Sequence, residues 1–425
     1  MGRGKVTGYS LVLLGLWASP TFLRASEARK APAMNLATDG AKPEMTWPLA
    51  DLLKVPAVAE AHSAQQVEGV RSLLMEGVPY RGQATQLFAY YAAPKGQPPA
   101  GGWPAVVIAH GGGGTAYAKY IQMWNDRGYA AIALDFYGKV PAPGVPPTER
   151  EALNKDFPDP YGAAPQAPEE EWSYHVVSAI IRAHSLLRSF PEVNPEKTGL
   201  VGTSWGGIHA CIAAGLDPRF KVVVAIYGCG FLSGGDKSIS FHRRFSGGLP
   251  WWDPSGYLPK TKAAFFWIAG TNDEDFSPDM RQKSIDLVPT TKATSLVVGL
   301  GHSDDGQAYP VVDRMLGSVL GKEAPFPALS RPQIDGSQVH ARYETERRPA
   351  KAELCYTTDP GDRASRNWQT LPAKLERDSV SASLPEAATA FFFNLYEKAG
   401  EAAPQGDVWP VSSAYVERPV PNAVK

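Results

Sequence analysis

The sequence carries almost no net charge and very little cysteine. Its 42 lysine and arginine residues nearly balance 43 aspartate and glutamate residues, for a formal net charge of −1. Without a basic run beyond the first few positions, we expect neither nucleic acid nor an anionic membrane as a partner. The three cysteines, Cys211, Cys229 and Cys355, are too few for a disulfide framework or a zinc site. A single disulfide between Cys211 and Cys229 is the alternative interpretation, and buried free thiols are the favoured one.

Long apolar runs are also missing after the start of the chain. There, Arg3 and Lys5 precede an apolar stretch at 11–17 and small residues near Ala25. This layout predicts a secretory signal peptide over residues 1–26, with an apolar stretch too short to span a bilayer. A single membrane anchor or a mis-assigned start is the alternative. We expect a secreted or periplasmic protein with no transmembrane segment after signal removal.

Motifs for metal and phosphate binding are absent. No His-Glu-x-x-His occurs, and the glycine run at 111–114 is followed by neither Lys-Ser nor Lys-Thr. We therefore expect no metal ion and no cofactor.

Short apolar stretches alternate with helical segments through the first three quarters of the sequence. Helical periodicity, as at 169–190, separates the stretches at the βαβ spacing of a mostly parallel sheet with helices on both faces. We place this domain at residues 67–322, after a flexible lead-in at 27–66. Its strands, buried on both faces, are predicted from the continuous apolar run at 105–109 and from similar, mostly apolar runs at 129–134, 198–201, 222–226, 264–269 and 294–298.

The pattern changes after a proline-rich linker at 325–332. Short alternating runs then appear, with glycine and aspartate in the turns between them. This is typical of a small antiparallel β-sandwich, which we place at residues 333–420. Its clearest strands are predicted at 339–343, 352–356, 380–384 and 391–396.

The strongest chemical signal is the run Gly202-Thr203-Ser204-Trp205-Gly206. It matches the nucleophile elbow G-x-S-x-G and lies between a buried strand and a helix, as that motif requires. The serine must sit on a strained turn so that its hydroxyl projects, and side chains at the flanking positions would collide with backbone. Ser204 is therefore predicted to be a nucleophile.

Chain order selects the partners of this serine, because the elbow is followed first by a carboxylate and then by a histidine. His302 directly follows the last predicted strand of the domain and is predicted to be the base. The acid should follow the preceding strand, where Asp273 fits best. Asp275 is its main competitor and Glu274 is third. A solvated turn is the non-catalytic interpretation of this acidic cluster.

A glycine run follows His110 at the end of an early buried strand. Acyl transfer through a tetrahedral intermediate needs fixed N–H donors for the oxyanion, and glycines let the backbone approach the substrate. We predict that the backbone N–H groups of Gly112 and Trp205 form this oxyanion hole.

With these motifs in place, the chain resembles the α/β-hydrolase superfamily, and within it the dienelactone-hydrolase and acetyl-xylan-esterase-like groups. The resemblance covers about residues 69–320 and implies the α/β-hydrolase fold and a Ser-Asp-His triad. Ser204 stands where dienelactone hydrolases proper use cysteine, which argues against that activity. The tail loosely resembles the immunoglobulin-like appendage of some exported bacterial hydrolases. The similar runs are 110–116, 128–131, 135–138, 270–273 and 301–302.

We therefore expect an exported serine carboxylic ester hydrolase that acts through an acyl-enzyme. Its substrate would be a small-molecule or polysaccharide ester, with deacetylation of a polysaccharide as the leading case. A serine peptidase of the prolyl-oligopeptidase type is the rival enzyme, although no propeller repeats precede residue 67. A non-catalytic binding protein on a hydrolase scaffold is the third hypothesis. The pair Trp251-Trp252 could stack on sugars or pack in the core, so it supports no substrate.

Overall fold

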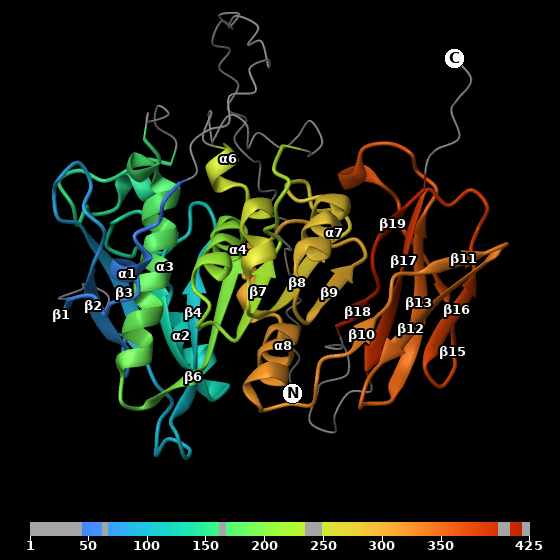
Figure 1. Cartoon of the computed structure of the whole chain (residues 1–425), viewed down its shortest axis with the longest axis horizontal. Helices are drawn as coiled ribbons and strands as arrows, with labels where there is room; N and C mark the ends of the chain where they lie inside the picture. Colours follow the sequence, from blue (N-terminus) through green and yellow to red (C-terminus); the bar gives the residue numbers. More distant parts are fainter. Residues whose placement is uncertain (1–44, 62–66, 161–166, 234–248, 398–408, 419–425) are drawn as a thin grey trace, which may run out of the picture. The chain divides into compact units, whose positions relative to one another are not determined.

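Mostly parallel strands form the centre of the protein, which a computed structural model describes over residues 45–61, 67–160, 167–233, 249–397 and 409–418. The first nine strands span Val58–Glu60 (β1), Arg71–Glu76 (β2), Gln86–Ala92 (β3), Trp103–Ala109 (β4), Ala130–Leu134 (β5), Val193–Thr203 (β6), Val222–Ile226 (β7), Ala264–Gly270 (β8) and Lys292–Val297 (β9). They lie side by side in the order β1-β2-β3-β5-β4-β6-β7-β8-β9 (Figure 1). All pairings from β5 to β9 are parallel, whereas β1, β2 and β3 add an antiparallel edge.

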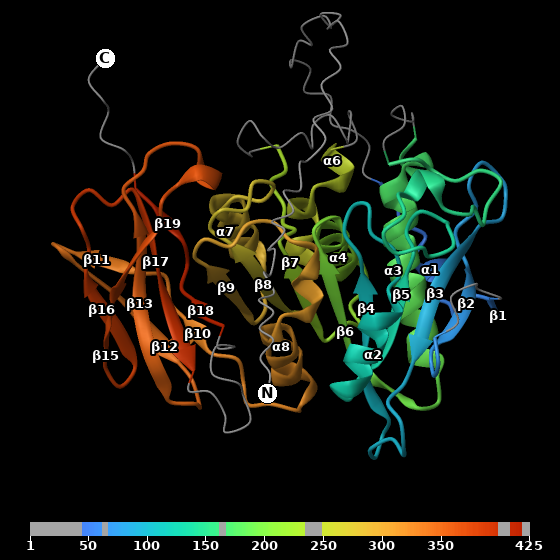
Figure 2. The ribbon, with the colours of Figure 1, turned by 180° about the vertical axis from the view of Figure 1, so that it is seen from behind.

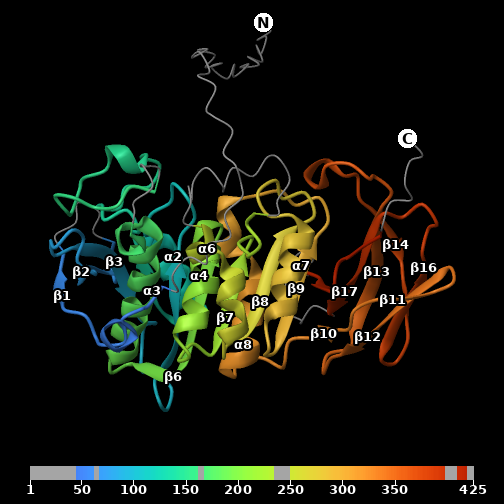
Figure 3. The ribbon, with the colours of Figure 1, turned by 45° about the horizontal axis from the view of Figure 1, so that its top comes forward.

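Helices cover both faces of this sheet. Figures 1 and 3 show α3 and α4 over one face, and Figure 2, from behind, shows α2 and α8 over the other. Because helices cover both faces, the side chains of the parallel strands are buried on both sides and appear in the sequence as continuous apolar runs. The described α-helices span Leu49–Leu52 (α1), Ala118–Asp126 (α2), Trp172–Ser189 (α3), Trp205–Leu216 (α4), Leu249–Trp252 (α6), Pro278–Leu287 (α7) and Pro310–Leu320 (α8). Short 3₁₀ turns span Pro147–Glu149, Pro168–Glu170, Pro254–Gly256, Leu258–Lys260, Asp304–Ala308 (η5) and Arg363–Ser365 (η6).

The mostly parallel sheet with helices on both faces, expected from the sequence, is confirmed. Strand β2 was not expected as a separate element. The flexible lead-in expected over residues 27–66 also differs from the structure in its described part. There Trp47 stacks on Tyr174 of α3 with ring centroids 5.0 Å apart, and Leu52 is fully buried. Apolar side chains of this kind are too costly to leave in water, so residues 45–53 pack against the helical layer, whereas 58–60 form the exposed edge strand β1.

The C-terminal strands build two antiparallel sheets that face one another. The first contains β13 (Pro349–Thr357), β14 (Gln369–Pro372), β17 (Ala390–Glu397), β18 (Val411–Ser412) and β19 (Val416–Glu417). The second contains β10 (Ala328–Leu329), β11 (Gln333–Asp335), β12 (Gln338–Glu344), β15 (Lys374–Leu375) and β16 (Ser379–Ser383). Between them lies an apolar core that includes Val339, Val380, Leu354, Phe391 and Phe393. The domain limits 67–322 and 333–420 stay a prediction.

The first C-terminal sheet continues the central sheet. Strand β18 pairs antiparallel with β9, where Ser412 lies opposite Thr294. The Ser412 hydroxyl accepts a hydrogen bond from the backbone N–H of Leu296 at 2.8 Å, and Asn394 Nδ2 donates to the Leu296 carbonyl at 3.1 Å. The strand that precedes the predicted base is therefore bonded directly to the C-terminal strands.

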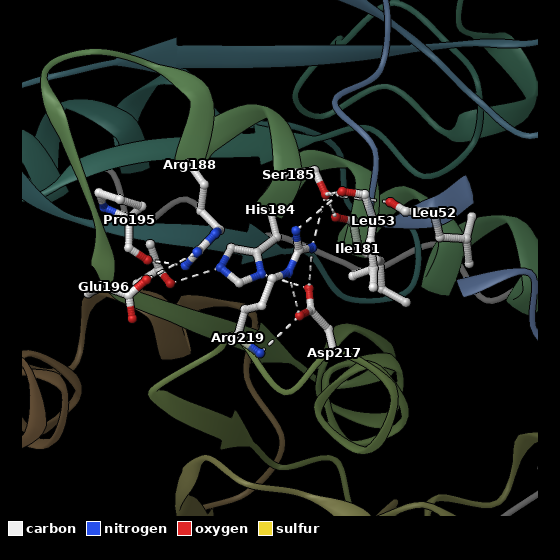
Figure 4. Close-up of polar contacts among 11 residues, drawn as sticks. Leu52, Leu53, Ile181, His184, Ser185, Arg188, Pro195, Glu196, Asp217 and Arg219 are labelled. Carbon is white, nitrogen blue, oxygen red and sulfur yellow. Dashed lines mark hydrogen bonds and ion pairs between the residues drawn. The ribbon is translucent and has the colours of Figure 1, made fainter. Parts of the chain in front are cut away.

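A buried polar cluster ties α3 to the central sheet at the end of α4 (Figure 4). His184 Nδ1 lies 2.7 Å from Asp217 Oδ2, and His184 Nε2 lies 2.8 Å from Thr198 Oγ1. Arg219 Nη2 donates to the same Asp217 oxygen at 2.7 Å. Although this hydroxyl, imidazole and carboxylate line up as they would in a catalytic relay, His184 and Thr198 are 0% exposed. No substrate can reach them, so the cluster is a structural connection.

The buried histidines predict how stability depends on pH. Burial lowers the pKa of His110 and His209 to about 3, and that of His175 and His184 to about 4. In the unfolded chain a histidine has a pKa near 6.5, so the unfolded state takes up protons first as the pH falls from about 6.5 toward 4. We therefore expect full stability above about pH 6.5 and a loss of about 2 kcal/mol per buried histidine at pH 5.

Urea unfolding at pH 7.5 and pH 5 measures this loss. The variant His184→Gln keeps a donor for Asp217 but cannot be protonated. The free energy of unfolding of this variant should therefore fall less between the two pH values, by the amount expected for one buried histidine. Equal unfolding free energies for the parent protein at the two pH values would contradict the prediction.

Candidate active site

Ser204 sits at the junction of β6 and α4 in a conformation that side chains rarely adopt, with φ 56° and ψ −116°. Its backbone N–H donates to the Ile226 carbonyl at 2.8 Å, and its own carbonyl accepts from the Ile208 N–H at 3.0 Å. These bonds from β7 and α4 hold a backbone conformation that is otherwise unfavourable. The strained turn places the Ser204 hydroxyl at the carboxyl end of the parallel strands, as the elbow motif predicts.

The two glycines of the elbow, Gly202 and Gly206, leave no space for a side chain. A Cβ atom on Gly202 would lie 2.2 Å from the Gly206 carbonyl oxygen, and one on Gly206 would lie 2.3 Å from the Ala109 carbonyl oxygen. Both contacts are with backbone, which cannot move aside without shifting β4 or α4. The sequence argument for glycine at these positions therefore has a direct steric cause.

We expect Gly206→Ala to lower the free energy of unfolding by about 3 kcal/mol, because the added methyl overlaps backbone in a packed core. Gly112→Ala is the matched control, since its Cβ would lie 3.5 Å from its nearest neighbour, Trp205 Cδ1. That is an ordinary contact, and we expect a change within about 0.5 kcal/mol. Chemical unfolding of both variants measures these free energies. A Gly206→Ala protein as stable as the Gly112→Ala control would contradict the prediction.

The structure brings the predicted base and acid to Ser204. His302 Nε2 lies 2.9 Å from Ser204 Oγ, and His302 Nδ1 lies 3.2 and 3.3 Å from the two carboxylate oxygens of Asp273. Asp273 is 2% exposed, and its Oδ1 also accepts the backbone N–H groups of Asp275 and Phe276 at 2.9 and 3.0 Å. The His302 ring packs beside Tyr227, with ring centroids 4.6 Å apart. A carboxylate on Nδ1 places the imidazole proton there and leaves Nε2 to face the hydroxyl.

The competing carboxylate lies on the other side of the imidazole. Asp275 Oδ2 is 4.0 Å from His302 Nε2, the nitrogen that faces Ser204, and its side chain is 43% exposed. From there it cannot accept the proton on Nδ1. The geometry therefore favours Asp273 over Asp275 as the partner of His302.

The glycine run after β4 lies against the serine. A Cβ atom on Gly111 would lie 3.2 Å from Ser204 Cβ. His110 shapes this run: its Nδ1 donates to the Gly111 carbonyl at 2.7 Å, and its Nε2 accepts the Phe136 N–H at 3.0 Å. Burial lowers the pKa of His110 to about 3, which keeps the ring neutral and suited to this pair of bonds. The glycine run thus lies beside the elbow, and the oxyanion hole at Gly112 and Trp205 stays a prediction.

A buried arginine that the sequence did not single out supports the same run. Arg150 donates from Nη2 to the Gly113 carbonyl and from Nη1 to the Gly114 carbonyl, both at 2.7 Å. Its charge is balanced by Asp135, 3.4 Å away, which also accepts a hydrogen bond from Thr115 at 2.7 Å. Asp135 belongs to a run that the resemblance pointed to. Arg150 lies in a loop with no local pattern, so nothing in the sequence indicated its role.

A cavity of about 270 Å³ opens beside the glycine run. Its walls include Tyr117, Lys119, Tyr120, Thr203 and Gln307. Gln307 Nε2 donates to Thr203 Oγ1 at 3.0 Å, next to the serine, while its buried Oε1 has no hydrogen-bond partner among the described residues. The cavity reaches Thr203, the residue before Ser204, but Ser204 and His302 are not among the residues that line it.

Other expectations concern cysteines, metals and the membrane. Cys211, Cys229 and Cys355 are all free and buried, which agrees with the favoured interpretation. In the described ranges, histidine, cysteine and acidic residues form no group suited to a metal ion. The helices described there are all too short or too polar to cross a membrane. The signal peptide predicted at 1–26 lies outside the described residues. Trp252 is fully buried, so it packs in the core.

Comparison with known proteins agrees with this fold. The model of the Dienelactone hydrolase family matches residues 87–297. The acetyl xylan esterase from Paenibacillus sp. R4 superposes with a TM-score of 0.51 at 19% identity, over 64% of this chain and 92% of that one. Acetyl xylan esterase 1 from Thermoanaerobacterium sp. JW/SL YS485 gives a TM-score of 0.48 at 15% identity, over 64% and 92% of the two chains. No curated protein matches the sequence.

The parallel sheet, the elbow and the order of the loops that follow define the class of fold: the chain has the α/β-hydrolase fold. More particularly, residues 87–297 form a domain of the Dienelactone hydrolase family.

Proposed function

We propose that this protein is a serine carboxylic ester hydrolase, with Ser204 as nucleophile, His302 as base and Asp273 as acid. The observation that carries the proposal is the hydrogen-bonded chain from Ser204 Oγ through His302 to Asp273, built on a strained elbow. A structural serine has no need of either the strain or the partners. The family match over residues 87–297 supports the same class of chemistry.

The mechanism follows from the positions of these groups. Ser204 Oγ attacks the ester carbonyl carbon while His302 Nε2 takes the hydroxyl proton, and Asp273 stabilises the resulting imidazolium without being protonated. The negative charge on the carbonyl oxygen is received by the backbone N–H groups of Gly112 and Trp205, and each such donor is typically worth about 3 kcal/mol. His302 then gives its proton to the departing alcohol, which leaves an acyl-enzyme. A water molecule attacks that ester with His302 again as base, and the acid is released.

For the substrate we propose acetyl esters of a polysaccharide. The cavity beside the glycine run is small and its walls are both polar and apolar, and its size suits a short acyl group better than a long alkyl chain. Acetyl xylan esterases are also among the structures that share this fold. Because these structural relatives are esterases, ester cleavage is also favoured over peptide cleavage.

The first experiment compares hydrolysis of p-nitrophenyl acetate, acetylated xylan and a chromogenic peptide with proline before the scissile bond. We expect turnover of the acetate ester and release of acetate from xylan. Peptide turnover without ester turnover would replace the proposal with a serine peptidase. Folded protein that turns over none of the three and is not labelled by a fluorophosphonate would point to a binding protein.

We further propose that the protein is exported. The supporting observation is the basic start, the short apolar stretch and the small residues within positions 1–26. Expression of the full-length gene product in a bacterium, followed by N-terminal sequencing of the extracytoplasmic fraction, should give a mature chain that starts near residue 27. Intact protein retained in the cytoplasm would overturn this.

A further inference from the structure

The residue directly before the proposed acid is bonded to a loop of the C-terminal region, between β13 and β14. Asn272 Nδ2 donates two hydrogen bonds, to the carbonyl of Ala364 at 2.9 Å and to that of Arg366 at 3.0 Å. Both carbonyls belong to the loop around η6, more than 90 residues further along the chain, since the bonded positions are 92 and 94 residues apart. Because carbonyls only accept, the orientation of the Asn272 amide is determined by these contacts.

The other end of the same amide reaches the loop that leads to the proposed base. Thr271 Oγ1 donates to Asn272 Oδ1 at 2.7 Å and accepts the backbone N–H of Gly299 at 2.9 Å. The backbone N–H of Asn272 donates to the Leu300 carbonyl at 3.2 Å. Position 300 is two residues before His302. Asn272 therefore joins the acid loop to the C-terminal region through its side chain, and to the base loop through its backbone N–H and the Thr271 hydroxyl.

The C-terminal loop is itself held firmly enough to act as a support. The Arg366 guanidinium is buried and donates to the Gly361 carbonyl and the Tyr415 hydroxyl, both at 3.1 Å. It also pairs with Glu417 at 2.8 Å. The Tyr415 backbone N–H in turn donates to Gln282 Oε1 on α7 at 2.9 Å. Backbone carbonyls held in this way offer Asn272 fixed acceptors.

We propose that Asn272 is a positioning residue, through which the C-terminal strands hold Asp273 against His302. The proposal rests on the hydrolase function proposed above. The bonds from His302 Nδ1 to Asp273 are 3.2 and 3.3 Å long, at the weak end of the range for hydrogen bonds. A small displacement of the acid loop would therefore break them, and a misplacement of about 1 Å can reduce an enzymatic rate by about 100-fold.

The rival explanation is that these contacts only stabilise the interface between the two regions. Two variants separate the possibilities from opposite sides. Asn272→Ala removes the donor on the acid loop, and Arg366→Met releases the loop that carries the acceptors. Glu397→Gln is the matched control, because Glu397 pairs with Arg314 of α8 at 3.0 Å across the same interface but away from the acid loop.

The measurements use full-length protein and p-nitrophenyl acetate. For Asn272→Ala we expect kcat to fall by about 10- to 100-fold with KM within about two-fold, since substrate contacts are unchanged. Arg366→Met should give a fall of the same kind, and the double variant should be no slower than the slower single variant, because both changes break one connection. Glu397→Gln should lower Tm to a similar extent and leave kcat unchanged.

The rate at which a fluorophosphonate labels Ser204 provides a second measurement. It should fall in Asn272→Ala in parallel with kcat, because labelling requires the serine to be activated by a correctly placed His302. This rate tests the positioning role even if p-nitrophenyl acetate is not turned over, so failure of the proposed substrate class is recognised separately. If Arg366→Met does not fold, Tyr415→Phe takes its place in the comparison. This variant removes only the hydrogen bond from Arg366 to the Tyr415 hydroxyl.

Three results would overturn the proposal. The first is an Asn272→Ala protein with parental kcat and labelling rate. The second is a pair of losses in Asn272→Ala and Arg366→Met that multiply in the double variant. The third is an equal loss of kcat in the Glu397→Gln control, which would reduce all three to effects on stability.

Discussion

Ser204→Ala is expected to lower kcat for ester hydrolysis by on the order of 10⁶-fold, since it removes the atom that forms the acyl-enzyme. His302→Ala should cost about as much, and the double variant should be no slower than either single one, because the two residues act as a unit. Alanine at position 204 has the same backbone strain as serine, for which φ is 56°, so stability should change little. Steady-state kinetics on p-nitrophenyl acetate and the Tm of each variant test these statements.

A fluorophosphonate supplies the control for this experiment. It should label the parent protein at Ser204 and leave Ser204→Ala unlabelled. If the variant kept a substantial share of the activity, or were labelled at another serine, the nucleophile would have been placed wrongly.

Asp273→Asn is expected to lower kcat by about 10⁴-fold with the fold intact. Asp273 Oδ1 accepts the backbone N–H groups of Asp275 and Phe276, and the amide oxygen of asparagine would keep those bonds. The amide NH₂ would then face His302 Nδ1 as a donor. The imidazole would have to carry its proton on Nε2, which could no longer accept the proton of Ser204.

Asp275→Asn is the matched control, because it changes a carboxylate of the same loop by the same atoms. Asp275 is 43% exposed and 4.0 Å from His302 Nε2, so water screens its charge. We expect kcat to fall by less than about ten-fold, the effect of a modest electrostatic contribution. Equal losses in the two variants, or a larger one for Asp275→Asn, would make Asp275 the acid.

The central sheet and the candidate site could be predicted because their signals are local. Each parallel strand is buried on both faces, which turns it into a run of apolar residues such as 222–226. The elbow is a five-residue motif in which glycine is needed because a side chain would collide with backbone of the same turn and of β4. The order of serine, acid and base along the chain then leaves few candidates, and the structure brings Ser204, Asp273 and His302 together.

Other features escaped because they depend on residues far apart in the sequence. Arg150 comes from an irregular loop, yet its guanidinium reaches carbonyls of the glycine run 36 and 37 positions earlier. A contact between such distant residues leaves no periodic pattern in the sequence from which it could be predicted. Trp47 lies in a segment whose composition suggests a flexible lead-in, and only the position of Tyr174 shows that it has a packing partner.

By itself, the sequence determined the class of fold and predicted Ser204 and His302, since burial and tight turns impose patterns within a few positions of the residue concerned. It left the acid open between Asp273, Asp275 and Glu274, and the positions of these carboxylates around His302 favour Asp273. Only the tertiary structure decided how the C-terminal strands relate to that site. The pairing of β18 with β9 and the bonds from Asn272 to the loop around η6 join residues separated by roughly a hundred positions. Backbone carbonyls accept these bonds, and because every residue has a carbonyl, the amino-acid sequence gives no sign of which ones will be used.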